Sequence, residues 1–158
     1  MKLPEPLFVV INPIMKFFLR SPAHGLWSRS IMLITFTGRK SGRTFTTPVR
    51  YVETEGTVRC FTMQENQWWR NLRGGADVVL RIRGVDRPYR AIAIHDDPAT
   101  IRQWLVNYLE QFPQDADYHE IRLTSDKRLD PDDLDKAISH AVVVEATPIA
   151  GETGATNP

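Results

Sequence analysis

Cysteine is nearly absent from this chain: Cys60 is the only one among 158 residues. A lone cysteine excludes a disulfide within the chain and favours a reducing compartment. The N-terminus also lacks the basic region, apolar core and small-residue cleavage site of a signal peptide. We therefore predict a cytoplasmic protein. Cys60 lies in an apolar run, residues 58–61, and is predicted to be a packed small side chain rather than a nucleophile.

The chain also has few residues arranged for metal or hydrolytic chemistry. Its four histidines, His24, His95, His119 and His140, are not spaced as metal ligands with one another or with Cys60. There is no Gly-x-Ser-x-Gly nucleophile elbow and no phosphate-binding loop of the P-loop spacing. We therefore predict no metal site and no hydrolase, and the sequence assigns no catalytic residue.

No hydrophobic run is long enough to span a bilayer. Residues 7–20 are the most apolar stretch, but Asn12, Pro13 and Lys16 interrupt them. Asn12 and Pro13 suit the cap and first turn of a short helix. Three roles stay open for this segment: packing on the core, covering a ligand pocket, or peripheral contact with the inner face of a membrane.

Charge is unevenly distributed, although the net charge is only +1. Residues 20–90 hold 13 Lys and Arg against 5 Asp and Glu, whereas residues 91–158 hold 5 against 13. An anionic partner therefore belongs to the first half. A nucleic acid is not predicted, because the sequence pI of about 7.9 is below the strongly basic range of such binders.

The basic half contains the segment Thr37-Gly-Arg-Lys-Ser-Gly-Arg43 between two β-like stretches. Two glycines allow the chain to turn where a positive φ is needed. The turn gathers backbone N–H groups, two hydroxyls and three cations, which are all donors that suit a phosphate or another multiply charged anion. The alternative is an exposed basic hairpin turn without a ligand.

The pattern of the whole chain predicts one α+β domain, a small antiparallel barrel of about six strands with helices at its rim. In the fifth strand, Ile92 and Ile94 are predicted to face inward. We expect an apolar lead-in at 1–30, the barrel domain at 31–147 and a disordered tail at 148–158. The predicted strands are 31–37, 44–53, 57–63, 78–83, 88–95 and 141–146, and the predicted helices are 65–73, 97–112 and 131–138.

Two adjacent tryptophans, Trp68 and Trp69, fall in the first of these helices. Neighbouring side chains on a helix diverge by about 100°, so one indole is expected to pack inward and the other to be free to line a pocket. Asn71 shares a face with Trp68, and an aromatic ring beside an amide suits a planar ligand with polar edges. The alternative is that both rings are wedged between helix and barrel.

Taken together, the Gly-Arg-Lys-Ser-Gly run, the Thr-Pro that follows it and the later Trp-x-x-Asn-Leu resemble the deazaflavin-dependent nitroreductase and quinone reductase family. The resemblance extends over residues 12–147 and implies a split β-barrel that uses coenzyme F420, whose tail carries a phosphate and several glutamates. It implies tail binding by the basic loop, with the Thr-Pro near the deazaflavin ring and the Trp and Asn lining the ring pocket. The cofactor-binding residues implied are Arg39, Lys40, Ser41, Gly42, Arg43, Thr47, Pro48, Trp68 and Asn71.

The function that this resemblance implies is hydride transfer from reduced F420 to a hydrophobic acceptor such as a quinone or nitro compound. Two alternatives stay open. One is a split-barrel reductase that uses FMN or FAD. The other is a non-catalytic carrier of a lipophilic ligand, which is favoured by the short connection 62–67, because it lacks Gly and Pro. Split-barrel relatives often form dimers, so a homodimer is a further expectation.

Overall fold

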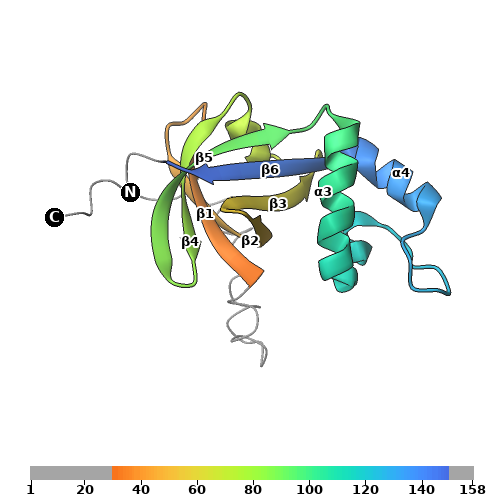
Figure 1. The fold of residues 1–158 in the computed structure, drawn as a ribbon. Helices are drawn as coiled ribbons and strands as arrows, with labels where there is room; N and C mark the ends of the chain where they lie inside the picture. Colours follow the sequence, from red (N-terminus) through yellow and green to blue (C-terminus); the bar gives the residue numbers. More distant parts are fainter. Residues whose placement is uncertain (1–29, 150–158) are drawn as a thin grey trace.

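The computed structural model describes residues 30–149, so the predictions for residues 7–20 and for most of the tail lie outside the described residues. Six antiparallel strands form a closed barrel in the order β1-β2-β3-β6-β5-β4 (Figure 1), which confirms the predicted split-barrel fold. The strands are β1 (Ile31–Thr37), β2 (Thr44–Thr54), β3 (Thr57–Met63), β4 (Ala76–Ile82), β5 (Val85–Ile94) and β6 (Ala141–Pro148), and the helical segments are η1 (Trp68–Leu72), α3 (Pro98–Gln111), η2 (Pro113–His119) and α4 (Pro131–His140).

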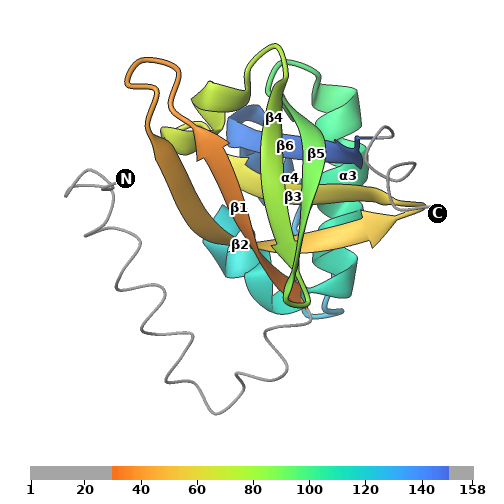
Figure 2. The same ribbon diagram turned by 90° about the vertical axis from the view of Figure 1, so that its left-hand side faces the viewer.

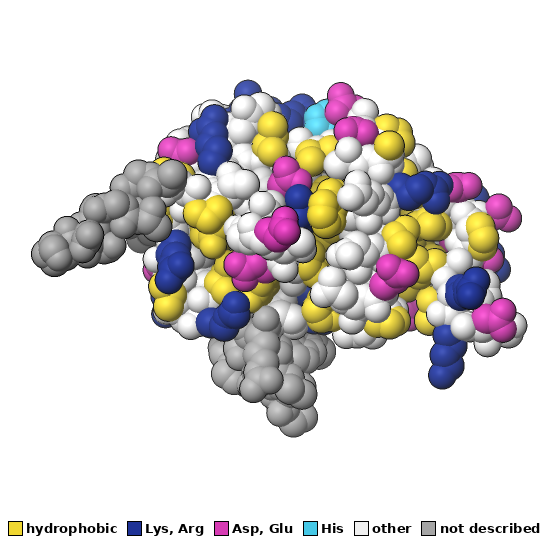
Figure 3. Space-filling view, viewed as in Figure 1, with side chains coloured by type: hydrophobic (Ala, Val, Ile, Leu, Met, Phe, Trp, Pro, Cys, Tyr) yellow, Lys and Arg dark blue, Asp and Glu magenta, His cyan; other side chains and the backbone are white. Residues whose placement is uncertain are grey.

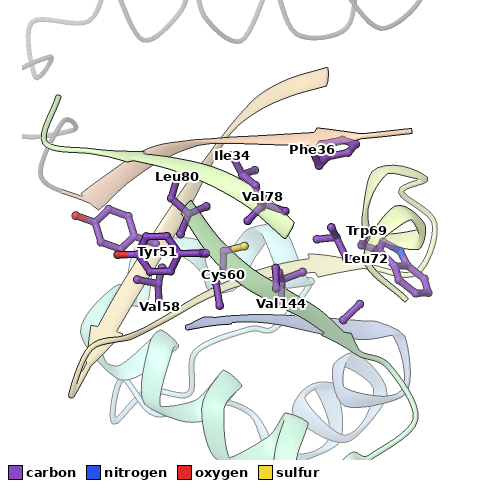
Figure 4. Close-up of a cluster of buried hydrophobic side chains, with 14 of the residues drawn as sticks. Ile34, Phe36, Tyr51, Val58, Cys60, Trp69, Leu72, Val78, Leu80 and Val144 are labelled. Atoms are coloured by element: carbon purple, nitrogen blue, oxygen red, sulfur yellow. The ribbon is translucent and has the colours of Figure 1, made fainter. Parts of the chain in front are cut away.

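The barrel interior holds one apolar cluster, to which every strand contributes alternate side chains. On β1, Met32, Ile34 and Phe36 face this interior while the residues between them face outward. The short helix η1 closes one end by inserting Trp69 and Leu72 (Figure 4). Trp69 is 1% exposed, so its removal is expected to cost about 3–5 kcal/mol of stability.

The prediction that Ile92 and Ile94 face the interior was wrong. Ile92 is 43% exposed, and the interior positions of β5 belong to Ala91 and Ala93. Ile94 is half-buried in a second cluster outside the barrel. The larger side chains suggested the wrong face, because the interior positions of β5 are occupied by small residues and a search for large apolar side chains passes over them.

A second apolar cluster lies between the outer face of the barrel and α3, η2 and α4 (Figures 1 and 2). On the barrel side, Phe61 of β3 stacks on Tyr108 of α3 with ring centroids 4.4 Å apart. The two long helices begin where the sequence predicted, since Asp97 and Asp130 cap their first turns. The 3₁₀ segment η2 was not predicted, because its polar residues give no helical periodicity.

Cys60 is buried in the interior of the barrel, as predicted. Burial raises the pKa of its thiol to about 12. A thiol with this pKa stays protonated at neutral pH, which makes it a weak nucleophile. Cys60 therefore acts as a small apolar side chain in the core.

His119 at the end of η2 makes the stability of the fold depend on pH. The side chain is 4% exposed, and neither ring nitrogen has a hydrogen-bond partner in the described part of the chain. Burial lowers its pKa from the ordinary value of 6.5 to about 4. Between pH 6.5 and pH 4 the unfolded chain therefore binds more protons at this residue than the folded chain, so stability falls as the pH falls through that window.

We predict that acidification from pH 6.5 to pH 4 costs about 3 kcal/mol through His119 alone. His119→Phe, which keeps an aromatic ring against Tyr108 and Tyr118, should flatten the plot of unfolding free energy against pH measured by urea denaturation. The exposed His140→Gln is the matched control and should keep the slope of the parent chain. An equal slope in His119→Phe and the parent would contradict this assignment.

Candidate functional site

The loop between β1 and β2 is a tight turn whose two glycines serve different purposes. The backbone N–H of Gly38 donates to the carbonyl of Arg43 at 2.7 Å, and that of Gly42 donates to the carbonyl of Gly38 at 2.9 Å. Gly42 has a φ of +69°, the left-handed conformation that the sequence suggested. At Gly38 the limit is space, because a Cβ there would lie 2.6 Å from Cε2 of Phe45.

The loop displays its three cations to solvent. Arg39, Lys40 and Arg43 are all exposed, and within residues 30–149 no carboxylate lies within ion-pair distance of them. Figure 3 shows Lys and Arg side chains along the upper edge of the molecule, where this loop and η1 lie in Figure 1. The hydroxyl of Ser41 accepts from the backbone N–H of Arg43 at 3.2 Å, which stabilises the turn. An unneutralised cluster of this kind attracts anions.

Asn71 joins this loop to η1, so the structure brings the two predicted motifs together. Its Oδ1 accepts from the backbone N–H of Arg39 at 2.9 Å, and its Nδ2 donates to the carbonyl of Trp68 at 2.9 Å. Figure 2 shows the loop and η1 side by side at one end of the barrel. Both polar groups of the amide are thus engaged within the protein, and the side chain fixes the position of the loop.

The adjacent tryptophans diverge as expected. Trp69 points into the barrel, whereas Trp68 is half-buried and packs on Phe36, with ring centroids 5.8 Å apart. Phe36 also contacts Phe45 at a centroid distance of 5.7 Å. Trp68 therefore belongs to an aromatic group at the barrel end that η1 closes, directly beside the basic loop.

Thr47 and Pro48 lie on β2, opposite Ile34 and Leu33 of β1. Directly opposed residues of antiparallel strands share a face. Thr47 therefore lies on the interior face with Ile34 and is half-buried, whereas Pro48 lies on the opposite face, where its side chain is buried. A single ligand cannot contact both side chains of this pair from one face of the sheet, so any shared contact has to use the β2 backbone.

Two arginines of the same region were missed by the sequence reasoning. The guanidinium carbons of Arg70 and Arg73 lie 5.1 Å and 5.0 Å from the centroid of the Trp69 ring. The signal was available, because both residues lie within or beside the Trp-x-x-Asn-Leu segment. They extend the positive charge of the loop over η1.

Other chemistry is less well represented in the described part of the chain. Residues 30–149 contain no group of three or more His, Cys, Asp or Glu side chains suited to a metal ion. Two cavities, of about 190 and 370 Å³, lie near Tyr89 and near His119, and neither is lined by a predicted cofactor residue. Within the same range no helix has both the length and the apolar character needed to cross a membrane.

The fold and the site define the class of protein: a split β-barrel with a basic, glycine-bounded loop at one end. A protein-family model described as F420H(2)-dependent quinone reductase matches residues 21–125. This match includes more than half of the 158 residues and all of the predicted cofactor-binding positions. The chain belongs to the F420H(2)-dependent quinone reductase family.

This chain is similar to several solved structures at low sequence identity, and the first two named here share its fold. A conserved hypothetical protein from Mycobacterium tuberculosis is 16% identical, with a TM-score of 0.52 over 81% of this chain and 80% of that chain. A chain described as a domain-swapped dimer is 19% identical, with a TM-score of 0.51 over 89% and 98%. An F420-H2 dependent reductase is 20% identical, with a TM-score of 0.46 over 73% and 94%. A comparison with curated protein sequences gives no significant match.

We predict that Asn71→Ala releases the loop. Loss of the Arg39–Asn71 bond should accelerate hydrogen exchange of the Arg39 amide by about fivefold, since one hydrogen bond contributes about 1 kcal/mol. Amide exchange measured by NMR tests this directly. Asn107→Ala removes a matched amide that accepts only from Gln111 on α3 and should leave the Arg39 amide unchanged. Unaltered exchange in Asn71→Ala would show that the loop holds itself in place.

Proposed function

We propose that this chain binds reduced F420 and transfers its hydride to a hydrophobic acceptor such as a quinone or nitro compound. The observation that carries the proposal is the basic loop: three exposed cations without a carboxylate partner in residues 30–149, fixed to η1 by Asn71. Membership of a family of F420H2-dependent reductases supports the choice of coenzyme.

The loop fits the tail of the coenzyme chemically. A phosphate and several glutamates present only acceptor oxygens, and Arg39, Lys40 and Arg43 present only donors. Backbone hydrogen bonds hold the turn in place before a ligand arrives, so the backbone positions from which the three cations extend are fixed. We assign the coenzyme tail to these three side chains, with Ser41 and Gly42 shaping the turn between them.

The ring of the coenzyme belongs at the adjoining aromatic group. Trp68 offers a half-buried planar surface beside the loop, and Thr47 and Pro48 lie on the neighbouring strand β2. When bound, F420H2 supplies the hydride. The protein residues orient the ring and exclude water. Asn71 contributes by positioning the loop, because its amide is already hydrogen-bonded on both sides.

Residues 7–20 are proposed to meet the hydrophobic acceptor or the inner face of the membrane, for a protein that is otherwise cytoplasmic. A homodimer is also proposed, because one structural neighbour is described as a domain-swapped dimer. Light scattering of the purified chain distinguishes one copy from two.

We predict that Lys40→Ala together with Arg43→Ala raises the dissociation constant of F420 by at least tenfold. Each charge-assisted contact contributes about 1.5–3 kcal/mol, and exposure reduces this value through screening by solvent and salt. Fluorescence titration of the coenzyme measures the constant. The double variant Lys127→Ala and Arg128→Ala removes the same charge from an exposed loop in the acidic half and should bind like the parent. Equal affinities in all three proteins would show that the cations of the loop do not bind the coenzyme.

Activity is tested by following oxidation of reduced F420 in the presence of a water-soluble naphthoquinone and an aromatic nitro compound. We expect protein-dependent oxidation with at least one acceptor. At low coenzyme concentration, turnover should be slower in the double variant Lys40→Ala and Arg43→Ala than in the parent. A yellow protein that co-purifies with FMN or FAD supports the flavin alternative instead. A lipid recovered by mass spectrometry, with no flavin or deazaflavin bound, supports the carrier alternative.

A further inference from the structure

Positive charge is concentrated on η1 beyond the residues assigned above. The guanidinium groups of Arg70 and Arg73 both lie near the Trp69 ring, at 5.1 Å and 5.0 Å from its centroid. Among residues 30–149 neither arginine has a carboxylate within ion-pair distance. These two positive charges, which have no carboxylate partner in that range, attract an anion to the surface of η1.

The same place contains hydrogen-bond donors that have no acceptor. Nε1 of Trp69 and Nε of Arg70 are buried, and neither has a hydrogen-bond partner among residues 30–149. Both atoms can only donate, and an unsatisfied buried donor costs about 1–3 kcal/mol. An acceptor oxygen of a phosphate, a carboxylate or a water molecule is the kind of group that satisfies such donors.

This charged surface is continuous with the β1–β2 loop. Nη1 of Arg39 donates to the carbonyl of Arg70 at 3.4 Å, and Asn71 joins the same two segments. Nη2 of Arg70 donates to the carbonyl of Gln64 at 3.2 Å, which fixes the orientation of its guanidinium. The loop and η1 thus present one extended basic surface with two separate groups of cations.

We propose that Arg70 and Arg73, assisted by the N–H of Trp69, form a second anion subsite that binds a phosphate or carboxylate of the ligand held by the loop. The proposal rests on the proposed function, since F420 is a ligand with several anionic groups along one tail. One anionic group lies at Arg39, Lys40 and Arg43, and another lies over η1. Affinity for the coenzyme therefore rises with the number of anionic groups in its tail.

Arg73→Gln tests the subsite, because Arg73 is exposed and its only described side-chain contact is with the Trp69 ring. The variant is titrated with F420 that carries several glutamates, with the coenzyme stripped of glutamates, and with the deazaflavin nucleoside that lacks phosphate as well. We expect at least a fivefold loss of affinity for the long-tailed form and less than a twofold loss for the nucleoside. Arg128→Gln, an exposed arginine far along the chain, should bind all three like the parent. An equal loss for all three ligands, or no loss for any, overturns the proposal.

A second measurement separates the subsite from the proposed function. The resonances of the Trp69 indole N–H and the Arg70 Nε–H are followed by NMR during titration with inorganic phosphate and with a γ-glutamyl tripeptide. Saturable shifts that weaken in Arg73→Gln support the subsite, and the stronger of the two ligands identifies the group it prefers. If these shifts occur while F420 does not bind, the subsite stands and the proposed function fails. No shift with phosphate, the tripeptide or F420 means that water satisfies the donors, and the subsite is overturned.

Discussion

The structure depends on how one end of the barrel is closed. A barrel of six strands needs its interior filled with side chains, and here η1 fills one end with Trp69 and Leu72. Because Trp69 turns inward, Trp68 and Asn71 are left at the rim, where they meet β1 and the basic loop. The packing of the core therefore determines the geometry of the candidate site.

The charges of the site follow from the same arrangement. Elsewhere among residues 30–149 many arginines are paired, as Arg50 is with Asp115 and Arg59 with Glu145. Within the same range the cations of the loop and of η1 have no carboxylate at ion-pair distance. Their positive charge is therefore available to attract an anion.

Much of the fold could be predicted from the sequence, because strands and turns are determined locally. Alternation of apolar residues gave the strands, glycines gave the turn at Gly42, and Asp97 with Pro98 gave the start of α3. The face of β5 could not be read this way, since the small residues Ala91 and Ala93 alternate with Tyr89 on the interior face, while the larger Ile92 and Ile94 lie on the other face. The polar segment η2 carried no periodic signal at all.

In the candidate site, too, some features are encoded by short sequence motifs, whereas others depend on contacts between residues far apart in the chain. The basic loop and the Trp-x-x-Asn-Leu segment were each recognisable, but the bond that joins them connects residues 32 positions apart. No local pattern encodes such a contact. For the same reason the engagement of the Asn71 amide, and the donors of Trp69 and Arg70 that lack acceptors, became visible only in three dimensions.

The central claim is that this basic surface binds a deazaflavin coenzyme. It is tested most directly by titrating the purified chain with oxidised F420 and following coenzyme fluorescence, with FMN and FAD titrated in parallel. The account predicts saturable binding of F420 that weakens as salt is added, and no comparable binding of either flavin. Preferential binding of FMN or FAD, or no binding of any of the three, would contradict it.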